Sequence, residues 1–228
     1  MIPPKPRRAR GWIKVPRMCV LADEPKRAKT CIIVPMADLK LENQRLLDVI
    51  DENDRVIETR SRSEIHRLGL LHRDIHVWMF DKDHNIFFQK RGVSVLWAGL
   101  LDSTVGGHLN AGEQYLVAAV RETEEETGIS VLPTDLVFLK KFKSVMNIPK
   151  GYFPKVINNF IRHLYIYKYP VKESQLKEEK GILGVGFRKF SAGFINNLKK
   201  EDERKFAECV LKEELPEVIK YLRDQGVN

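Results

Sequence analysis

Residues 107–129 read GHLNAGEQYLVAAVRETEEETGI. A glycine-containing loop leads here into a predicted helix that carries Glu122, Glu125 and Glu126. These positions are i, i+3 and i+4, so the carboxylates are expected to converge on one helix face. Like charges at this spacing repel each other unless a cation lies among them. Mg²⁺ takes oxygen ligands and bridges to phosphates, so the stretch predicts a divalent-metal site.

The opposite face of this helix is expected to be buried. Leu116, Ala119, Val120 and Thr123 recur at i, i+3, i+4 and i+7, the spacing of a core-facing stripe. Gly128 then predicts the C-terminal stop. We therefore expect the helix to pack on a core and to present its acidic face outward. A solvated, Glu-rich helix is the alternative that the run of glutamates alone would favour.

The spacing of the whole motif favours the metal site. Five residues separate Gly107 from Glu113, and seven more precede Arg121-Glu122, after which come Glu125-Glu126 and Gly128. This series resembles the complete signature of the Nudix hydrolase superfamily, with Thr123 as its one departure from a bulkier aliphatic residue.

The resemblance implies a fold and a chemistry. The fold is α+β: an α/β/α sandwich around a mixed β-sheet, with an N-terminal extension and C-terminal helices. The chemistry is hydrolysis of a diphosphate bond. Mg²⁺, or Mn²⁺, would be held by the catalytic residues Glu122, Glu125 and Glu126. The residues that would shape the motif are Gly107, Glu113, Arg121 and Gly128.

Segments outside the motif resemble one branch of the superfamily, which includes isopentenyl-diphosphate isomerase and its hydrolase-like relatives. The resemblance is carried by residues 48–56, 62–67, 69–73 and 102–108. His72 and His108 match metal-binding histidines of the isomerase, and His66 matches a third loosely. The same three histidines are alternatively structural, hydrogen-bonding to backbone and orienting loops.

Two further comparisons favour hydrolysis over isomerisation. The isomerase needs a catalytic cysteine just before its Gly-His pair, and this chain has Gly106 there. Glycine has no thiol and cannot serve as an acid or a base. The two glutamates that the isomerase uses on a later strand correspond to Asn158 and Phe160.

The expected substrate is a nucleoside diphosphate linked to a further group, or a related organic diphosphate. Lys90 and Arg91, at the end of a predicted strand, and His108, beside the motif loop, are expected to contact its phosphates. The general base is expected to be one glutamate of the trio or one on a later loop, where Glu178 and Glu179 are candidates, although the alignment places Gly181 there. The alternatives are isopentenyl-diphosphate isomerase and a non-catalytic protein that binds nucleotides or RNA.

Composition restricts the class of protein. The chain has 228 residues, of which 43% are hydrophobic and 31% charged, enough for one sizeable core. It has no apolar run long enough to cross a bilayer and no secretory signal. Its three scattered cysteines indicate thiols in a reducing compartment. These observations predict a cytoplasmic protein without a membrane partner.

Much of the net charge of +8 lies near the N-terminus. Residues 1–44 carry ten Lys or Arg and four acids, a balance of +6, which leaves +2 for the rest. We therefore expect a basic extension over residues 1–44 and a Nudix hydrolase domain over residues 45–228. A solvated extension is the simpler interpretation, and contact with nucleic acid is the alternative. A homo-oligomer is compatible with the sequence.

Hydrophobic patterns and turn residues predict the secondary structure. The expected strands are 46–50, 55–59, 75–80, 86–90, 137–142, 161–169 and 182–190. Besides the motif helix, helices are expected from residue 63 and over 192–198, 202–211 and 216–224. Within the extension, 15–22 and 30–35 are candidates for a hairpin or for packing on the main domain.

Overall fold

The computed structural model describes residues 43–92, 99–147, 157–178 and 185–226, with the backbone of 19–20 and 32–33. In the extension, β1 (Cys19–Val20) pairs antiparallel with β2 (Ile32–Ile33), which confirms the predicted hairpin. The boundary between extension and domain stays a prediction.

The centre of the molecule is a six-stranded mixed sheet in the order β4-β3-β5-β10-β9, with β8 also paired to β5. Strands β5 and β10 are parallel and the other pairs antiparallel. The strands are β3 (Leu46–Ile50), β4 (Val56–Ser61), β5 (Leu71–Trp78), β8 (Val105–His108), β9 (Leu136–Asn147) and β10 (Ile157–Tyr167). A three-stranded sheet joins β11 (Gly186–Phe190), β6 (Ile86–Lys90) and β7 (Leu101–Asp102).

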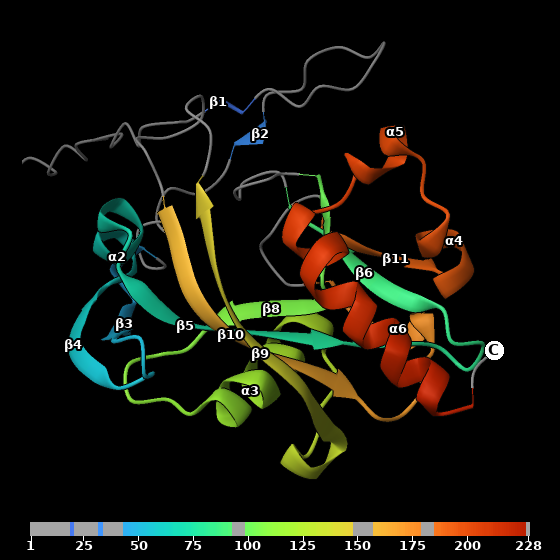
Figure 1. Ribbon diagram of the computed structural model, residues 1–228, viewed down its shortest axis with the longest axis horizontal. Coiled ribbons are helices and arrows are strands. Elements are labelled where there is room, and N and C mark those ends of the chain that lie inside the picture. Colours follow the sequence, from blue (N-terminus) through green and yellow to red (C-terminus); the bar gives the residue numbers. More distant parts are fainter. Residues whose placement is uncertain are drawn as a thin grey trace, which may run out of the picture.

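Helices cover both faces of the central sheet (Figure 1). The motif helix is α3 (Tyr115–Thr127), and a core containing Ile75, Val77 and Ala119 lies between it and the sheet. On the other face, Trp78 and Leu164 pack against the C-terminal helices. The remaining helices are α2 (Arg62–Leu68), α4 (Ala192–Asn196), α5 (Lys200–Glu203), the π-helical turn η3 (Val210–Glu214) and α6 (Leu215–Asp224). Short 3-10 turns are η1 (Pro133–Asp135) and η2 (Glu173–Gln175). The expected α+β fold around a mixed sheet is confirmed.

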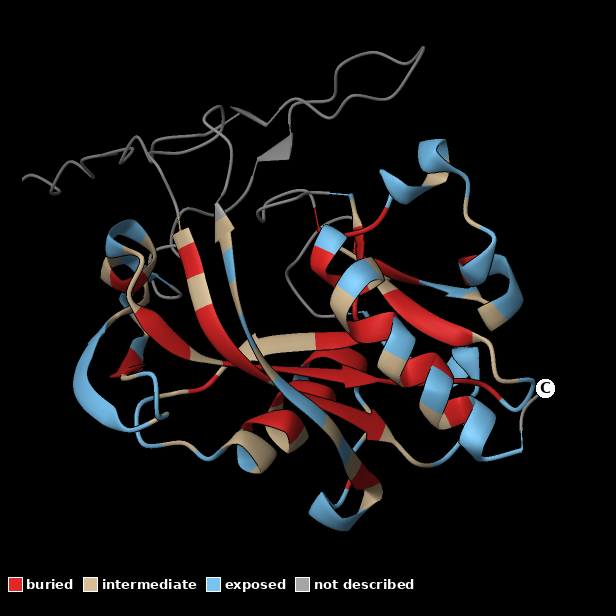
Figure 2. Cartoon of the chain, in the orientation of Figure 1, coloured by how far each residue is buried: buried red, intermediate tan, exposed pale blue. Residues whose placement is uncertain are grey.

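Figure 2 shows that buried residues are concentrated in β3, β5 and β10 of the central sheet and on the inner faces of α3 and α6. The expectation that α3 presents its acids outward is wrong for Glu122 and Glu126, which are buried. Thr123 is also buried, and its hydroxyl donates to the Ala119 carbonyl oxygen at 2.6 Å, so its polar atom is satisfied. Gly128 ends the helix in the left-handed conformation, as predicted.

One other prediction from the pattern is wrong, and two short strands were not predicted. Residues 202–211 do not form one helix, because the chain leaves the helix to bridge β7: Phe206 pairs with Leu101. The amide of Leu101 donates to the Lys205 carbonyl, and the amide of Ala207 donates to the Leu101 carbonyl. The short strands β7 and β8 were not predicted, since their segment is rich in Gly and Ser and lacks a hydrophobic alternation.

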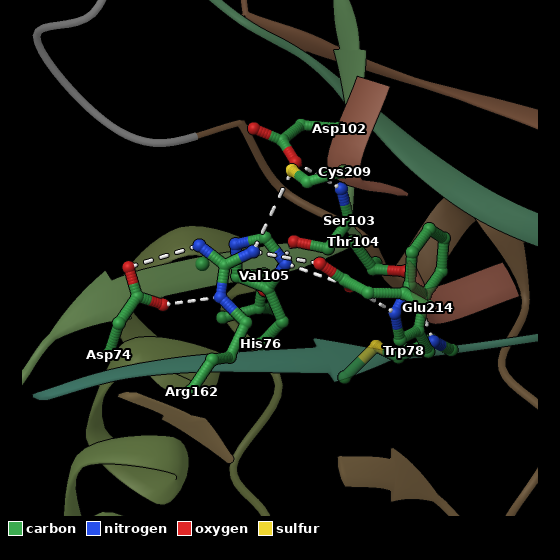
Figure 3. Close-up of polar contacts among 12 residues, drawn as sticks. Asp74, His76, Trp78, Asp102, Ser103, Thr104, Val105, Arg162, Cys209 and Glu214 are labelled. Carbon is green, nitrogen blue, oxygen red and sulfur yellow. Dashed lines mark hydrogen bonds and ion pairs between the residues drawn. The ribbon is translucent and has the colours of Figure 1, made fainter. Parts of the chain in front are cut away.

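A buried ionic network joins the sheet to the C-terminal segment (Figure 3). Arg162 of β10 donates two hydrogen bonds to Asp74 of β5, at 2.8 and 3.1 Å, and one to Glu214 of η3, at 2.7 Å. Glu214 is fully buried. Burial alone would raise the pKa of Glu214, but His76 and Arg162 hold it below its usual range. The carboxylate is therefore ionised and fixes η3 to the sheet.

Replacing Arg162 by Met should destabilise the fold strongly. The change leaves Asp74 and Glu214 buried without their cation, which costs about 3–5 kcal/mol of unfolding free energy. Arg60→Met is the control, because the ion pair of Arg60 with Glu58 is exposed and should contribute less than about 1 kcal/mol. Urea unfolding followed by tryptophan fluorescence measures both variants. Equal effects of the two changes would contradict this account of the network.

Candidate functional site

The glycines of β8 allow α3 to approach the sheet closely. A Cβ atom on Gly107 would collide with the carboxyl group of Glu122. The amide of Gly106 donates to Glu126 Oε2 at 3.2 Å, and Gln89 of β6 donates to the same oxygen at 3.0 Å. Two acids of the motif therefore lie against the backbone of one strand, and the space that Glu122 fills is open only because residue 107 is glycine.

Arginines hold the acids of the motif. Glu122 Oε1 lies 2.7 Å from Arg121 Nη1 and 3.2 Å from Arg45 Nη2. Burial raises the pKa of Glu122, and the two arginines only partly offset this. Glu125 is 54% exposed and also contacts Arg121 Nη1, at 3.0 Å.

The expected convergence of the carboxylates is incomplete in this structure. Glu122 and Glu125 meet at one guanidinium nitrogen, whereas Glu126 turns toward β8 and β6. A buried acid with a raised pKa beside further carboxylates is a donor set that suits a hard divalent cation, so these residues fit Mg²⁺ by their chemistry. Arg121 would have to release its contact for a cation to bind between Glu122 and Glu125.

Glu113 shapes the loop that precedes α3. Arg121 donates to its two carboxylate oxygens, from Nε and Nη2, each at 2.8 Å. The amide of Asn110 donates to Glu113 as well, at 2.8 Å. Burial opposes ionisation of Glu113, but these donors lower its pKa. The pairing of Glu113 with Arg121 therefore links the loop to the middle of α3.

Three histidines gather beside the motif loop. His66 of α2, His72 of β5 and His108 of β8 have ring nitrogens within 4.8 Å of one another. His66 Nε2 and His108 Nε2 are 3.2 Å apart. His72 Nδ1 contacts the Leu70 carbonyl oxygen at 3.0 Å, which is the backbone contact expected of a structural histidine.

The histidine cluster is uncharged and only partly satisfied. Burial lowers the pKa of His66 to about 3 and that of His108 well below its usual value. His72 Nε2 and Asn158 Oδ1 are buried and lack a hydrogen-bond partner. Neutral imidazoles with an orphaned ring nitrogen form a donor set that fits a transition-metal ion.

A cavity of about 110 Å³ opens on the face of the sheet opposite α3. Its lining includes Arg62, Arg91, Arg162, His76, His108 and Cys209. Of the three residues expected to contact phosphate, Arg91 and His108 line this cavity and Lys90 does not.

The charges around this cavity are paired. Arg91 Nη1 lies 2.6 Å from Asp102 Oδ2. Burial opposes the charge of Asp102, but Arg91 and its other neighbours lower the pKa to about 2. Glu178 is exposed, and Glu179 and Gly181 lie outside the described residues, so the structure does not test the candidate base at that place.

Several residues of the site carried no sequence signal. His76 and Glu214 are hydrogen-bonded partners separated by 138 positions, and Arg45 reaches Glu122 across 77 positions. A single sequence has no local pattern that marks such contacts.

The fold and the motif define a protein of the Nudix class, and comparison with known proteins agrees. The chain belongs to the NUDIX domain family, whose model matches residues 70–206. Members of this family of hydrolases act on diphosphate bonds.

Two relatives are uncharacterized Nudix hydrolases. The first, from Streptomyces coelicolor, is 42% identical over 98 residues, which are 42% of this chain and 54% of that protein. The second, from Clostridium acetobutylicum, is 29% identical over 147 residues, 62% of this chain and 68% of that protein.

Two further matches concern the branch and the fold. An isopentenyl-diphosphate Delta-isomerase of Serratia proteamaculans is 30% identical over 135 residues, 59% of this chain and 72% of that protein. A crystal structure of a Deinococcus radiodurans protein superposes with a TM-score of 0.55 at 17% identity, covering 75% of this chain and 97% of that one. Among the described residues, no helix is long and apolar enough to cross a membrane.

Replacing Gly107 by Ala should impair activity more than stability. The new methyl group displaces the Glu122 carboxylate, and overpacking of this kind costs about 1–3 kcal/mol. A comparable misplacement of a catalytic group lowers turnover about 100-fold. Gly193→Ala is the control, since its nearest neighbouring atom would lie at 3.9 Å. Thermal unfolding and a diphosphate-hydrolysis assay measure the two effects. Full activity of the Gly107 variant would contradict the assigned contact.

Proposed function

We propose that the chain hydrolyses the diphosphate bond of a nucleoside diphosphate derivative or a related organic diphosphate. The observation that carries this proposal is the contact of the acidic helix with the glycine strand, where Glu122 lies against Gly107 and Glu126 accepts from Gly106. The cavity with its arginines lies on the other face of the same strand. Acids for a cation and arginines for phosphate oxygens thus lie on the two sides of one short strand.

In the proposed reaction, Glu122, Glu125 and Glu126 would hold Mg²⁺ or Mn²⁺. The bound cation supplies charge neutralisation and lowers the pKa of a bound water. In this structure Arg121 contacts Glu122 and Glu125 through one guanidinium nitrogen, and it would release this contact to the cation. Glu113 and Arg121 fix the loop before α3, and Arg91 is placed at the cavity to orient a phosphate group.

The space around Gly106 supports hydrolysis over isomerisation. A Cβ atom on Gly106 would lie 2.7 Å from His76 Nε2 and 3.2 Å from Ser103 Oγ. A cysteine side chain at this position would therefore have to displace the imidazole of His76. The chain lacks the thiol and also fills the space that a thiol would need.

The histidine cluster favours a second candidate function. Its three ring nitrogens suit a separate transition-metal centre, as in the isomerase branch. Asn158 faces this cluster with a neutral amide, where the isomerase has a carboxylate. Conversion of one prenyl diphosphate isomer to the other is the activity that would establish this candidate. Binding of nucleic acid, a homo-oligomer and a cytoplasmic location remain predictions from the sequence.

A panel of substrates with Mg²⁺ tests the proposed hydrolysis. The panel contains nucleoside diphosphate derivatives, dinucleoside polyphosphates, capped RNA and prenyl diphosphates, with phosphate release and product mass as readouts. Glu126→Gln should lower turnover at least about 100-fold, because a cation contributes several kcal/mol to such reactions. Glu124→Gln removes the same charge from an exposed position of the same helix and should leave turnover unchanged. Wild-type protein that turns over no member of the panel would contradict the proposal.

Cobalt binding tests the histidine centre separately. Co²⁺ added to the metal-free protein should give visible absorption bands at one equivalent, because three imidazoles would hold it. His72→Leu should abolish these bands, whereas the control His84→Asn, in a turn outside the cluster, should retain them. Bands that persist in the His72 variant would show that the ion binds elsewhere.

A further inference from the structure

One histidine of the cavity is oriented by a buried carboxylate. His76 of β5 is 4% exposed, and its Nδ1 lies 2.9 Å from Glu214 Oε2. Glu214 also accepts from Trp78 Nε1 at 3.0 Å and from Arg162 Nη1 at 2.7 Å. Figure 3 shows these side chains meeting between the sheet and the C-terminal segment. Three donors thus fix the carboxylate, and the carboxylate fixes the imidazole.

This arrangement determines the tautomer of His76. A carboxylate with three donors and a lowered pKa is ionised and can only accept. His76 Nδ1 must therefore carry the hydrogen, which leaves the lone pair of the neutral ring on Nε2. The same relation of carboxylate and imidazole prepares a histidine to take a proton in hydrolases with a Ser-His-Asp triad.

The basic nitrogen adjoins the proposed reaction centre. His76 Nε2 would lie 2.7 Å from a Cβ on Gly106, so only glycine leaves it open. His76 lines the cavity together with Gly106 and Gly107. Among the described residues, none is hydrogen-bonded to Nε2. The amide of Gly106 contacts Glu126, so the imidazole and a proposed metal-binding acid flank one residue.

We propose that His76 Nε2 is the general base of the hydrolysis and that Glu214 is its positioning residue. The proposal rests on the proposed function. Water forms the new bond to phosphorus through its oxygen, and one of its protons passes to His76 Nε2. The bond from phosphorus to the bridging oxygen breaks, and the electron pair stays on the leaving phosphate. The imidazolium, stabilised by Glu214, then returns the proton to solvent.

The charged groups around the imidazole come from four elements. The acids are Glu214 of η3, Asp102 of β7 and Asp74 on the same strand. The cation is Arg162 of β10, which is paired with Asp74 and Glu214. The thiol of Cys209 lies 3.9 Å from Arg162, and burial raises its pKa to about 12, so it stays neutral.

A pair of variants separates a base from a structural residue. His76→Gln removes the basic nitrogen, and Asp81→Ala removes a buried carboxylate of the turn between β5 and β6, which accepts from the amides of Asp83 and Asn85. Both variants lose buried hydrogen bonds, so both should lower the melting temperature. Only His76→Gln should lower kcat, by about 10²–10⁴-fold, and remove the acidic limb of the pH–rate profile. Equal loss of kcat in the two variants would overturn the proposal.

Two measurements test more directly the role of His76 as the base and that of Glu214 as its positioning residue. Imidazole added to His76→Ala should restore turnover at least about 10-fold, because the vacated space adjoins the cavity. Glu214→Gln can donate to Nδ1 and so should move the hydrogen to Nε2, with a loss of turnover similar to that of His76→Gln. Nitrogen NMR of the histidine rings reports this change of tautomer. Absence of rescue together with an unchanged tautomer would overturn the assignment.

A binding experiment distinguishes failure of this proposal from failure of the proposed function. Imidodiphosphate with Mg²⁺ is a non-hydrolysable probe and requires no turnover. Its addition to the wild-type protein should shift the NMR signal of His76 Nε2 and leave that of His84, outside the cavity, unchanged. An unshifted His76 signal at saturation would overturn the proposal, even if hydrolysis is observed. A shifted signal without turnover of any substrate would support the site and contradict the proposed hydrolysis.

Discussion

The close approach of α3 to β8 is the constraint on which the rest of the site depends. Alternate residues of a strand face opposite sides of a sheet, so Gly106 and Gly107 open different spaces. The space at Gly107 is filled by Glu122 from one side, and that at Gly106 by His76 from the other. Because Gly106 and Gly107 lack side chains, the acidic helix and the buried imidazole of His76 both contact the backbone of β8.

Buried charges explain why the imidazole of His76 is held rigidly. A carboxylate as deeply buried as Glu214 is tolerated only when donors satisfy it. Arg162, His76 and Trp78 provide those donors from two strands of the central sheet. The network therefore positions the C-terminal segment over the cavity, and it gives the imidazole a fixed direction. Stability and site geometry depend on the same contacts.

The features of the fold and of the site that could be predicted are those that a local sequence pattern marks. The end of α3 at Gly128 and the strand Ile86–Lys90 followed from turn residues and apolar runs. The burial of Glu122 and Glu126 did not, because a helical pattern treats every acid as solvent-facing. Only the tertiary contact with a glycine strand reverses that assignment. His76 and Glu214, distant in sequence, meet only through the fold.

The space around Gly106 also indicates how hydrolysis and isomerisation differ within the branch that includes isopentenyl-diphosphate isomerase. If the absent cysteine were the only difference, the chain would resemble an isomerase that has lost one catalytic group. Here the position of the cysteine thiol is occupied by an imidazole held by Glu214, and a neutral amide, Asn158, faces the histidine cluster. Restoring a cysteine would displace His76 without supplying the carboxylate. Several groups would have to change together, because the residues around β8 form one packed set.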